Sequence, residues 1–253
     1  MQDSPDQPNT DGYFPEPIAA RYDEKSAERF APEILDPTVD FLANLAGNGP
    51  ALEFATGTGR IAIPLAERGV TVHGIDMSAA MTKRLHDKPG GENISVEIGD
   101  FATTQINEKF TLVYLVFNTI MNLTTQDAQI ACFQNAAAHL QPGGRFVIEV
   151  GVPRLRDLPP GETIHVYRDE ESQRDYDEYD IANQGLTSHH LTLEENGEWE
   201  HWSLPFRYVW PAELDLMAKL SGLKPHERYS DWNQEPFTSD SENLIAIWKK
   251  PDD

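Results

Sequence analysis

The chain has 253 residues, with 20 Lys and Arg against 42 Asp and Glu, and a formal net charge of -22 at pH 7. This length fits one domain, or one domain with an appended subdomain. Nucleic-acid binding draws its affinity from Lys and Arg that neutralise phosphates, so the charge argues against DNA and RNA as partners. No apolar run approaches the roughly 18 residues that a membrane span needs, and we therefore expect no membrane association.

The chain has a single cysteine, Cys132, which cannot form an internal disulfide. Its apolar surroundings favour a buried thiol over a nucleophile. The first eleven residues contain no Lys or Arg and no apolar core, so they do not resemble a signal peptide. We expect a cytoplasmic protein, with residues 1–12 as a flexible tail because they are polar, acidic and rich in proline.

From Pro50 onward, short apolar runs alternate with longer amphipathic stretches. Five apolar runs predict strands at 51–55, 70–75, 96–98, 110–117 and 145–150. Apolar residues at spacings of three and four predict helices at 61–68, 79–86 and 126–140. Continuous apolar runs suit strands that are covered on both faces, so this pattern indicates an α/β fold with a parallel sheet.

After Pro153 the hydrophobic pattern changes to the period of two that is typical of strands. Alternating aromatic and apolar residues share one face of a predicted strand: Trp202, Leu204, Phe206, Tyr208 and Trp210. Asn196-Gly197 predicts a hairpin turn to a strand at 186–193, so we expect an antiparallel insertion. Its apolar face must pack on the core, on substrate or on a second subunit, and in the last case the protein is a homodimer.

The acidic residues at 169–180 suggest a solvated face or, alternatively, a surface for a cationic acceptor. Beyond the insertion, a helix is predicted at 212–221 and ended by Gly222. Two strands follow at 224–229 and 244–248, and we expect them to extend the core sheet.

The segment from Ala51 to Arg60 predicts a strand, a glycine-rich turn and the start of a helix. Gly57 and Gly59 allow the backbone to approach a ligand closely. The turn fits the dinucleotide pattern G-x-G-x-x-[GA], and Asp76 ends the next strand about where a ribose-binding acid belongs. A nicotinamide-dependent oxidoreductase is therefore one interpretation.

Glu53 favours a different cofactor. Its carboxylate, four residues before Gly57, would repel a pyrophosphate and stabilise an ammonium group. S-adenosylmethionine carries an amino group and a sulfonium but no phosphate, and the two oxygens of Asp76 can accept hydrogen bonds from both ribose hydroxyls. Asp100 and Phe101, at the end of the third strand, supply a carboxylate for the adenine amino group and a ring to stack on the base.

The motifs E-x-A-x-G-x-G, G-I-D, G-D-F and L-x-P-G-G occur in order, and with them the sequence resembles the class I S-adenosylmethionine-dependent methyltransferases. The resemblance runs from Tyr22 to about Val150. It implies a Rossmann-like seven-stranded sheet, mostly parallel with the last strand antiparallel, carrying the inserted antiparallel subdomain. The implied regions are an N-terminal helical lid at 13–49, a cofactor-binding core at 50–153, the acceptor-site insertion at 154–210 and a C-terminal completion of the core at 211–253.

The resemblance also implies S-adenosyl-L-methionine as cofactor and a set of residues that contact it. This set is Tyr22, Arg29, Glu53, Ala55, Gly57, Gly59, Asp76, Met77, Met81, Asp100, Phe101 and Phe117. Glu53, Ala55 and Gly57 would line the methionine moiety, Met77 and Phe101 would hold adenine, and Phe117 would pass beneath the sulfonium. Tyr22 and Arg29 resemble a lid segment over the methionine end.

A narrower resemblance is to the amino-sugar N-methyltransferases, which share the tyrosine-bearing N-terminal helix and the inserted sheet. Several of them carry a histidine after the fourth strand, where this chain has Asn122, and asparagine cannot act as a base. We expect methyl transfer to a nitrogen or oxygen of a small-molecule acceptor by in-line displacement. The candidate catalytic residues are Tyr22, Asn122 and His190, with His201 and Tyr229 as further candidates.

Two alternatives remain open at this point: an oxidoreductase that uses the same glycine-rich turn, and a non-catalytic binding module with the same fold. Adjacent strand residues face opposite sides, so His189 and His190 do not form a metal pair and we expect no metal site.

Overall fold

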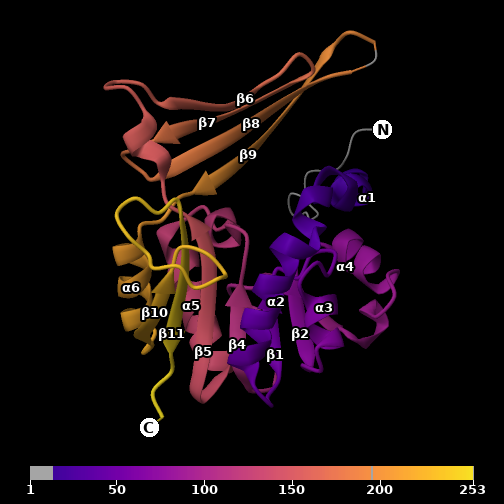
Figure 1. Cartoon of the computed structure of the whole chain (residues 1–253), viewed down its shortest axis with the longest axis vertical. Coiled ribbons are helices and arrows are strands. Elements are labelled where there is room, and N and C mark those ends of the chain that lie inside the picture. Colours follow the sequence, from indigo (N-terminus) through magenta and orange to yellow (C-terminus); the bar gives the residue numbers. More distant parts are fainter. Residues whose placement is uncertain (1–13, 195, 253) are drawn as a thin grey trace, which may run out of the picture.

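The computed structural model of the protein describes residues 14–194 and 196–252. Its core is a seven-stranded sheet with the strand order β10-β11-β5-β4-β1-β2-β3 (Figure 1). The strands are β1 (Ala51–Phe54), β2 (Val72–Asp76), β3 (Ser95–Ile98), β4 (Phe110–Leu115), β5 (Leu140–Gly151), β10 (Lys224–Tyr229) and β11 (Asn243–Lys249). All neighbours are parallel except β11, which is antiparallel to both β5 and β10. The predicted fold class is confirmed.

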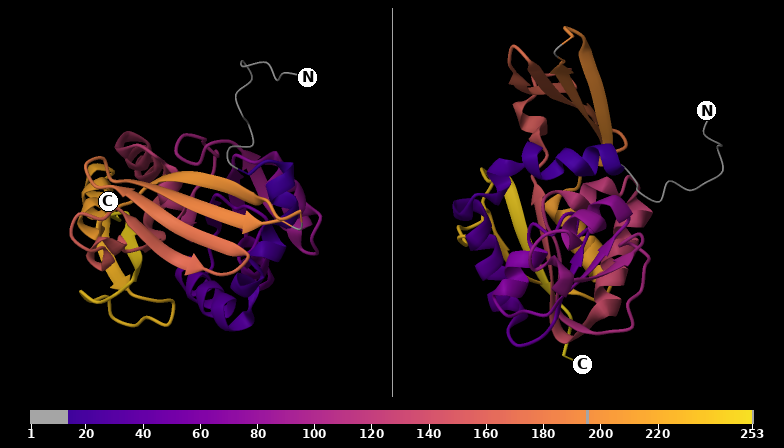
Figure 2. Two further views of the ribbon diagram at one scale, coloured as in Figure 1. Left: turned by 90° about the horizontal axis from the view of Figure 1, so that it is seen from above. Right: turned by 90° about the vertical axis from the view of Figure 1, so that its right-hand side faces the viewer.

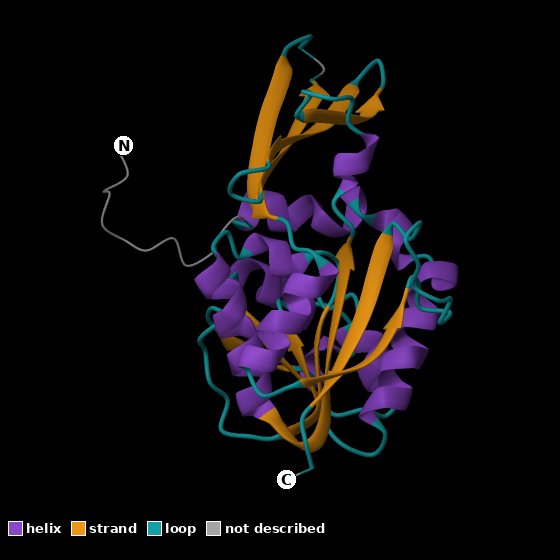
Figure 3. Ribbon diagram, turned by 90° about the vertical axis from the view of Figure 1, so that its left-hand side faces the viewer, coloured by secondary structure: helices purple, strands orange, loops and turns teal. Residues whose placement is uncertain are grey.

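Helices cover both faces of the core sheet (Figure 3), which explains why β1 is buried at every residue and β4 at all but one. Side chains of α2 (Pro32–Ala46), α3 (Ala62–Glu67) and α4 (Ala79–His86) belong to one hydrophobic cluster. Side chains of α5 (Gln126–His139) and α6 (Pro211–Leu220) belong to the cluster on the other face. Cys132 lies fully buried on α5, as predicted.

Most core elements lie close to their predicted bounds, and α4 and β10 match them. The main difference is β5, which begins at Leu140, five residues before the predicted strand. The Pro-Gly-Gly segment is extended because it pairs with the end of the chain. The amide of Gly143 donates to the carbonyl of Lys250 at 3.1 Å, and the amide of Lys250 donates to the carbonyl of Gly144 at 2.9 Å.

A second sheet of four antiparallel strands lies across the top of the core (Figure 2). It contains β6 (Ile164–Asp169), β7 (Gln173–Asp180), β8 (Gly185–Leu193) and β9 (Trp199–Arg207) in sequential order. Asn196 and Gly197 lie between β8 and β9 as predicted, and Gly197 has the positive φ of 83° that favours glycine. The predicted antiparallel insertion is therefore present, and β6 and β7 are strands that sequence periodicity did not delimit.

The N-terminal helix α1 (Glu16–Lys25) docks beside α4, between the two sheets (Figure 1). Two ion pairs hold it there, Glu16 with Arg84 and Asp23 with Lys88. The hydroxyl of Ser78 also donates to the carbonyl of Phe14 at 2.8 Å. The flexible tail expected at residues 1–12 lies outside the described residues. Within those residues, no helix is both long and apolar enough to cross a membrane.

A buried polar network joins the inserted sheet to the core. Arg207, at the end of β9, donates to Gln129 on α5 and forms a 2.7 Å ion pair with Glu213 on α6. The side-chain amide of Gln129 in turn donates to the backbone carbonyl of Arg207 at 3.0 Å. The side chain of Arg207 is 8% exposed and that of Glu213 is 14% exposed, so each charge depends on its partner for solvation.

We expect Arg207→Met to destabilise the protein by about 3–5 kcal/mol, because it leaves Glu213 partly buried without its cation. Urea unfolding of the wild type and the variant measures this change. Asp40→Ala serves as the control, since it removes only an exposed ion pair to Arg68 and should cost less than about 1 kcal/mol. Equal effects of the two substitutions would contradict the assignment of this network as the joint.

Candidate active site

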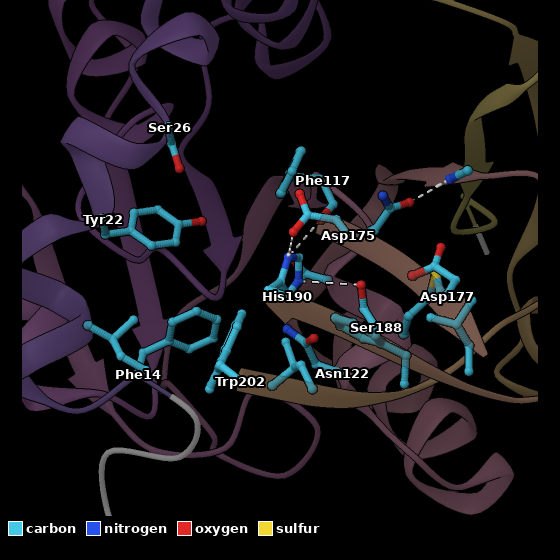
Figure 4. Close-up of a pocket in the computed structure, with 18 of the residues that line it drawn as sticks. Phe14, Tyr22, Ser26, Phe117, Asn122, Asp175, Asp177, Ser188, His190 and Trp202 are labelled. Atoms are coloured by element: carbon cyan, nitrogen blue, oxygen red, sulfur yellow. Dashed lines mark hydrogen bonds and ion pairs between the residues drawn. The ribbon is translucent and has the colours of Figure 1, made fainter. Parts of the chain in front are cut away.

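A cavity of about 1530 Å³ lies between the two sheets. Its floor is formed by the segments that follow β1, β2, β3 and β4, and its roof by the inner faces of β7, β8 and β9. Helix α1 closes one side. Figure 4 shows Tyr22 on one side of this space and His190, Ser188 and Asp175 on the other.

The floor lies where the strand order of the core sheet reverses, because β1 is flanked by β4 on one side and β2 on the other. Open α/β sheets bind ligands at such a point, outside the carboxyl ends of the strands. Ala55, Phe117 and Asn118 follow these strands with φ values of 55°, 62° and 59°. A left-handed conformation at a non-glycine residue costs about 1–3 kcal/mol and is often found at functional sites.

Local hydrogen bonds hold this left-handed backbone in place. The amide of Ala55 donates to the carbonyl of Ile75 at 2.8 Å. The amide of Phe117 donates to the carboxylate of Glu149 at 2.9 Å, and the side chain of Asn118 accepts from the amide of Gly151 at 2.6 Å. The turns after β1 and β4 are thus fixed in the shape that opens the cavity.

The glycine-rich turn is tied to the end of β2 by Asp76. The carboxylate of Asp76 accepts from the amide of Gly57 at 2.6 Å and from the amide of Ser78 at 2.8 Å. Both Gly57 and Asp76 line the cavity. Gly57 has a φ of 58°, and a Cβ atom there would point into open space, so a glycine leaves room for a ligand against the backbone.

The predicted adenine-binding residues also line the cavity. Met77 is 40% exposed, which is unusual for a large apolar side chain beside a cavity, whereas Phe101 is mostly buried and stacks on Phe54. The carboxylate of Asp100 accepts from the amide of Ala102 at 2.8 Å, which fixes the turn after β3. Met81 lines the same side from α4.

Tyr22 and Arg29 line the cavity from the N-terminal segment. The guanidinium of Arg29 lies 3.7 Å from the centre of the Phe117 ring, in a cation–π contact. The ring of Tyr22 packs edge to face against Phe14 at 5.8 Å. Burial raises the pKa of Tyr22, against the opposing effect of Arg29, so its hydroxyl stays protonated at neutral pH.

Two predicted cofactor residues lie outside the set that lines the cavity. Gly59 packs against the side chains of Ile63 on α3 and Leu85 on α4, each of which would lie 2.9 Å from a Cβ atom at this position. Glu53 is 3% exposed beneath the turn, and its Oε2 has no hydrogen-bond partner among the described residues. Burial raises the pKa of Glu53 to about 8, and Arg60 opposes this shift.

The roof of the cavity combines an apolar strip with a polar cluster. The predicted aromatic stripe faces inward in part, because Trp202, Leu204 and Phe206 line the cavity. Beside this strip, His190 lies 3.1 Å from Asp175, and its other ring nitrogen lies 3.4 Å from the hydroxyl of Ser188. Tyr208 also lines the cavity but is 2% exposed, and Trp210 caps α6 at its N-terminus.

Sequence analysis missed Asp175, Ser188 and Tyr167 as members of this cluster. The signal was present as a period of two: alternate residues of β7 and β8 face the cavity, and Asp175 pairs with His190 across the strands. Asp175 belongs to the acidic run at 169–180, which is therefore not solvated throughout, since Asp175 is 3% exposed.

The other candidate residues are dispersed. Asn122 lines the cavity from the segment after β4. His201 lies on the outer face of the inserted sheet, stacked on His189 at 5.2 Å, and Tyr229 packs against Phe41 on the core. Among the described residues, no three His, Cys, Asp or Glu side chains are grouped as a metal site would require.

The buried carboxyl of Glu53 makes stability depend on pH. Its pKa is raised from 4.5 to about 8, so between these values the folded protein holds a proton that the unfolded chain releases. Stability from this group therefore falls as pH rises through this window, by about 1.4 kcal/mol per pH unit. We expect Glu53→Gln to remove this slope in urea unfolding measured from pH 5 to pH 8. Glu67→Gln, at an exposed site on α3, is the control and should leave the slope in place.

Known proteins resemble this chain over most of its length. A family model described as a methyltransferase domain matches residues 51–144. The structure of the CcbJ methyltransferase from Streptomyces caelestis is 33% identical in sequence, covers 96% of this chain and 100% of its own, and has a TM-score of 0.85. The cypemycin N-terminal methyltransferase from a Streptomyces species is 25% identical over 244 residues, which cover 90% of this chain and 97% of that protein.

A further structural neighbour shares the fold. CalS10, an amino pentose methyltransferase from Micromonospora echinaspora whose structure contains S-adenosylmethionine, has a TM-score of 0.66 at 17% identity and covers 88% of this chain and 95% of its own. None of these relatives supports the two alternatives, an oxidoreductase or a non-catalytic module.

Proposed function

The chain belongs to the S-adenosylmethionine-dependent methyltransferases of small-molecule type, and we propose that it methylates a nitrogen or oxygen atom of its acceptor by in-line displacement. The observation that carries this proposal is a single cavity with two unlike walls. The floor presents the glycine-rich turn and Asp76, and the roof presents an apolar strip beside a polar cluster. Such an arrangement can hold two different molecules against each other.

The residues on the floor fit S-adenosylmethionine. A Cβ atom at Gly57 would have no neighbour closer than 4.0 Å, Asp76 lines the cavity beside this turn, and Met77 offers an exposed apolar surface for adenine. The orphaned Oε2 of Glu53 lies beneath this turn, where a bound ammonium would lower the cost of its ionisation.

When bound, S-adenosylmethionine supplies a methyl group activated by its sulfonium. The task of this chain is then to align the acceptor lone pair with the methyl carbon and to exclude water, since a reacting distance of about 3–3.5 Å supplies much of the acceleration. Arg29 and Phe117 would cover the methionine end, and α1 with Tyr22 would close the side of the cavity. Tyr22, Asn122 and His190 are the side chains that we propose to contact the acceptor.

The names of several relatives favour nitrogen as the methylated atom. The cypemycin enzyme is an N-terminal methyltransferase, KedS8 from Streptoalloteichus is a sugar N-methyltransferase and MtfA is a glycopeptide N-methyltransferase. The residues that line the cavity support this preference, because more of them carry a carboxylate than a guanidinium group. An electronegative wall stabilises an acceptor that carries a protonated amine.

Calorimetry tests the cofactor, and labelled transfer tests the reaction. We expect S-adenosylhomocysteine to bind and NADH not to bind. We also expect label from methyl-labelled S-adenosylmethionine to appear in a small molecule of a cell extract, whose mass and fragmentation identify the methylated atom. Binding of NADH without S-adenosylhomocysteine would refute the proposal, as would label found only in nucleic acid.

Asp76→Asn should weaken binding of S-adenosylhomocysteine by about 1.5–3 kcal/mol, the cost of a lost hydrogen bond to a charged group. The amide replaces a two-oxygen acceptor with one oxygen and one donor. Asp87→Asn on the exposed end of α4 is the matched control, and calorimetry should find its affinity unchanged. An unchanged affinity in Asp76→Asn would show that the ribose is held elsewhere.

Substitutions of Tyr22 separate two roles for its side chain. If the hydroxyl orients the acceptor, both Tyr22→Phe and Tyr22→Ala should lower kcat on the order of 10²-fold. If the ring only shields the sulfonium, through a cation–π attraction worth about 0.5–2 kcal/mol, Tyr22→Phe should keep kcat near the wild-type value. We expect the first outcome, because Tyr22 faces the cavity with a protonated hydroxyl. Wild-type kcat in both variants would remove Tyr22 from the active site.

A further inference from the structure

A histidine and a buried aspartate on the inserted sheet form a pair, and the reaction outlined above assigns no proton transfer to it. His190 is the only histidine among the described residues that line the cavity. We propose that His190 is the general base that takes a proton from an ammonium group of the acceptor, and that Asp175 is the positioning residue that holds its imidazole. This inference rests on the proposed function and adds the route of the proton to it.

The imidazole of His190 is held on several sides. Its Nδ1 lies 3.1 Å from the Oδ1 of Asp175, and the indole of Trp202 stacks on its face at 5.0 Å. Tyr167 packs against it edge to face at 6.5 Å. Figure 4 shows the ring between Asp175 and Ser188, facing the space beside Asn122 and Trp202. The ring orientation is therefore set before any acceptor binds.

Asp175 is itself fixed by a second set of contacts. Its Oδ2 accepts from the amide of Gln173 at 2.8 Å and lies 3.6 Å from the Nε of Arg168. Its side chain is 4% exposed, so it has little access to water and is committed to these partners and to His190. This leaves the carboxylate in one place, where it can orient the imidazole and stabilise the imidazolium that forms.

The contacts of Asp175 decide which nitrogen of His190 is free. An ionised carboxylate only accepts hydrogen bonds, so the neutral ring carries its proton on Nδ1 and donates it to Asp175. The Nε2 lone pair is then the acceptor, with the hydroxyl of Ser188 at 3.4 Å. Tyr167 lies 3.2 Å from the same hydroxyl, so Ser188 has an alternative partner when the acceptor takes its place beside Nε2.

The other polar groups at the cavity are less suited to this role. The amide of Asn122 has no basic nitrogen. Tyr22 keeps its proton because burial raises its pKa. The charged or titratable groups that face His190 are Tyr167 and Arg168 on β6 and Asp175 and Asp177 on β7, while Trp202 on β9 is uncharged. Asp177, whose pKa is raised by burial, adds a further carboxyl to the wall that an ammonium would approach.

The proposed step balances in protons and electrons. The ammonium nitrogen of the acceptor loses one proton to Nε2 of His190, which frees its lone pair. The freed lone pair of the nitrogen forms a bond to the methyl carbon while the carbon–sulfur bond breaks. The electron pair of the broken bond stays on sulfur. The methylated nitrogen carries the positive charge, and His190 releases its proton to solvent. No oxidant, reductant or metal enters the step.

Nitrogen NMR of the imidazole tests the pair without an acceptor. The protein is labelled with ¹⁵N-histidine and saturated with S-adenosylhomocysteine, and the His190 signals are assigned as those that are lost in His190→Gln. We expect the neutral imidazole of His190 to be the Nδ1–H tautomer. Asp175→Asn should shift this equilibrium toward the Nε2–H form, since the amide can also donate. His189→Gln is the control on the adjacent, outward-facing position and should leave the His190 signals unchanged. An Nε2–H tautomer in the wild type would overturn the proposal.

Kinetics tests the route of the proton with two matched probes, 4-phenylpiperidine and 4-phenylcyclohexanol. Where the amine is methylated, we expect His190→Gln to lower kcat on the order of 10²–10⁴-fold and to remove the fall in kcat at low pH, with binding of S-adenosylhomocysteine unchanged. Asp175→Asn should lower kcat less, and His189→Gln should not lower it. A His190→Gln enzyme with wild-type kcat and pH profile would overturn the proposal, as would faster methylation of the alcohol.

The two proposals fail in different ways. If S-adenosylhomocysteine does not bind, the proposed function is wrong. If it binds but His190 has the wrong tautomer, only the role of the histidine pair is wrong. Where neither probe is methylated, the NMR result alone decides between these outcomes.

Discussion

The reversal of strand order beside β1 is the constraint on which the rest of this structure depends. The crossover from β1 leads to one side and that from β4 to the other, so neither of the crossover helices, α3 or α5, covers the gap above the carboxyl ends of these strands. Ala55 and Phe117 follow these two strands in the left-handed conformation. The hydrogen bonds from the amide of Phe117 to Glu149 and from the amide of Gly57 to Asp76 hold the turns after β4 and β1 in place. The contacts that we propose between the glycine-rich turn and the cofactor depend on this fixed gap.

The sequence predicted the core because the signals there are local. Strands β1 and β4 are mostly apolar runs, the hydroxyl of Ser78 caps α4 by accepting from the amide of Met81, and the glycine-rich turn has its own pattern. The start of β5 was predicted five residues late, because its pairing with Lys250 is non-local. The sequence analysis placed Glu53 at the methionine end because of its position along the strand. The burial of Glu53 beneath the turn could not be inferred from the spacing of the motif.

Which side chains of the inserted sheet face the cavity depends on the register of strand pairing, which a single sequence does not reveal. The acidic run at 169–180 looks uniform, yet a period of two directs Asp175 and Asp177 inward and Tyr176 outward. Which alternate set faces the cavity is decided by the pairing of Asp175 with His190 across β7 and β8. Shifting that pairing by one residue would bring His189 inward instead, and the polar cluster would be lost.

In the function proposed above, the two sheets carry different parts of the chemistry. The floor would hold the cofactor beside the glycine-rich turn and Asp76, whose positions depend on the path of the core chain. The roof would contact the acceptor through side chains at alternate positions of β7, β8 and β9, which can be exchanged without altering the strands that bear them. The buried Arg207 network fixes the roof above the floor, so the two sets of side chains keep one relative position. In the proposed reaction, in-line displacement requires the acceptor lone pair to approach the methyl carbon from the side opposite the sulfur, and a proton acceptor on the roof, such as His190, would have to lie on that side.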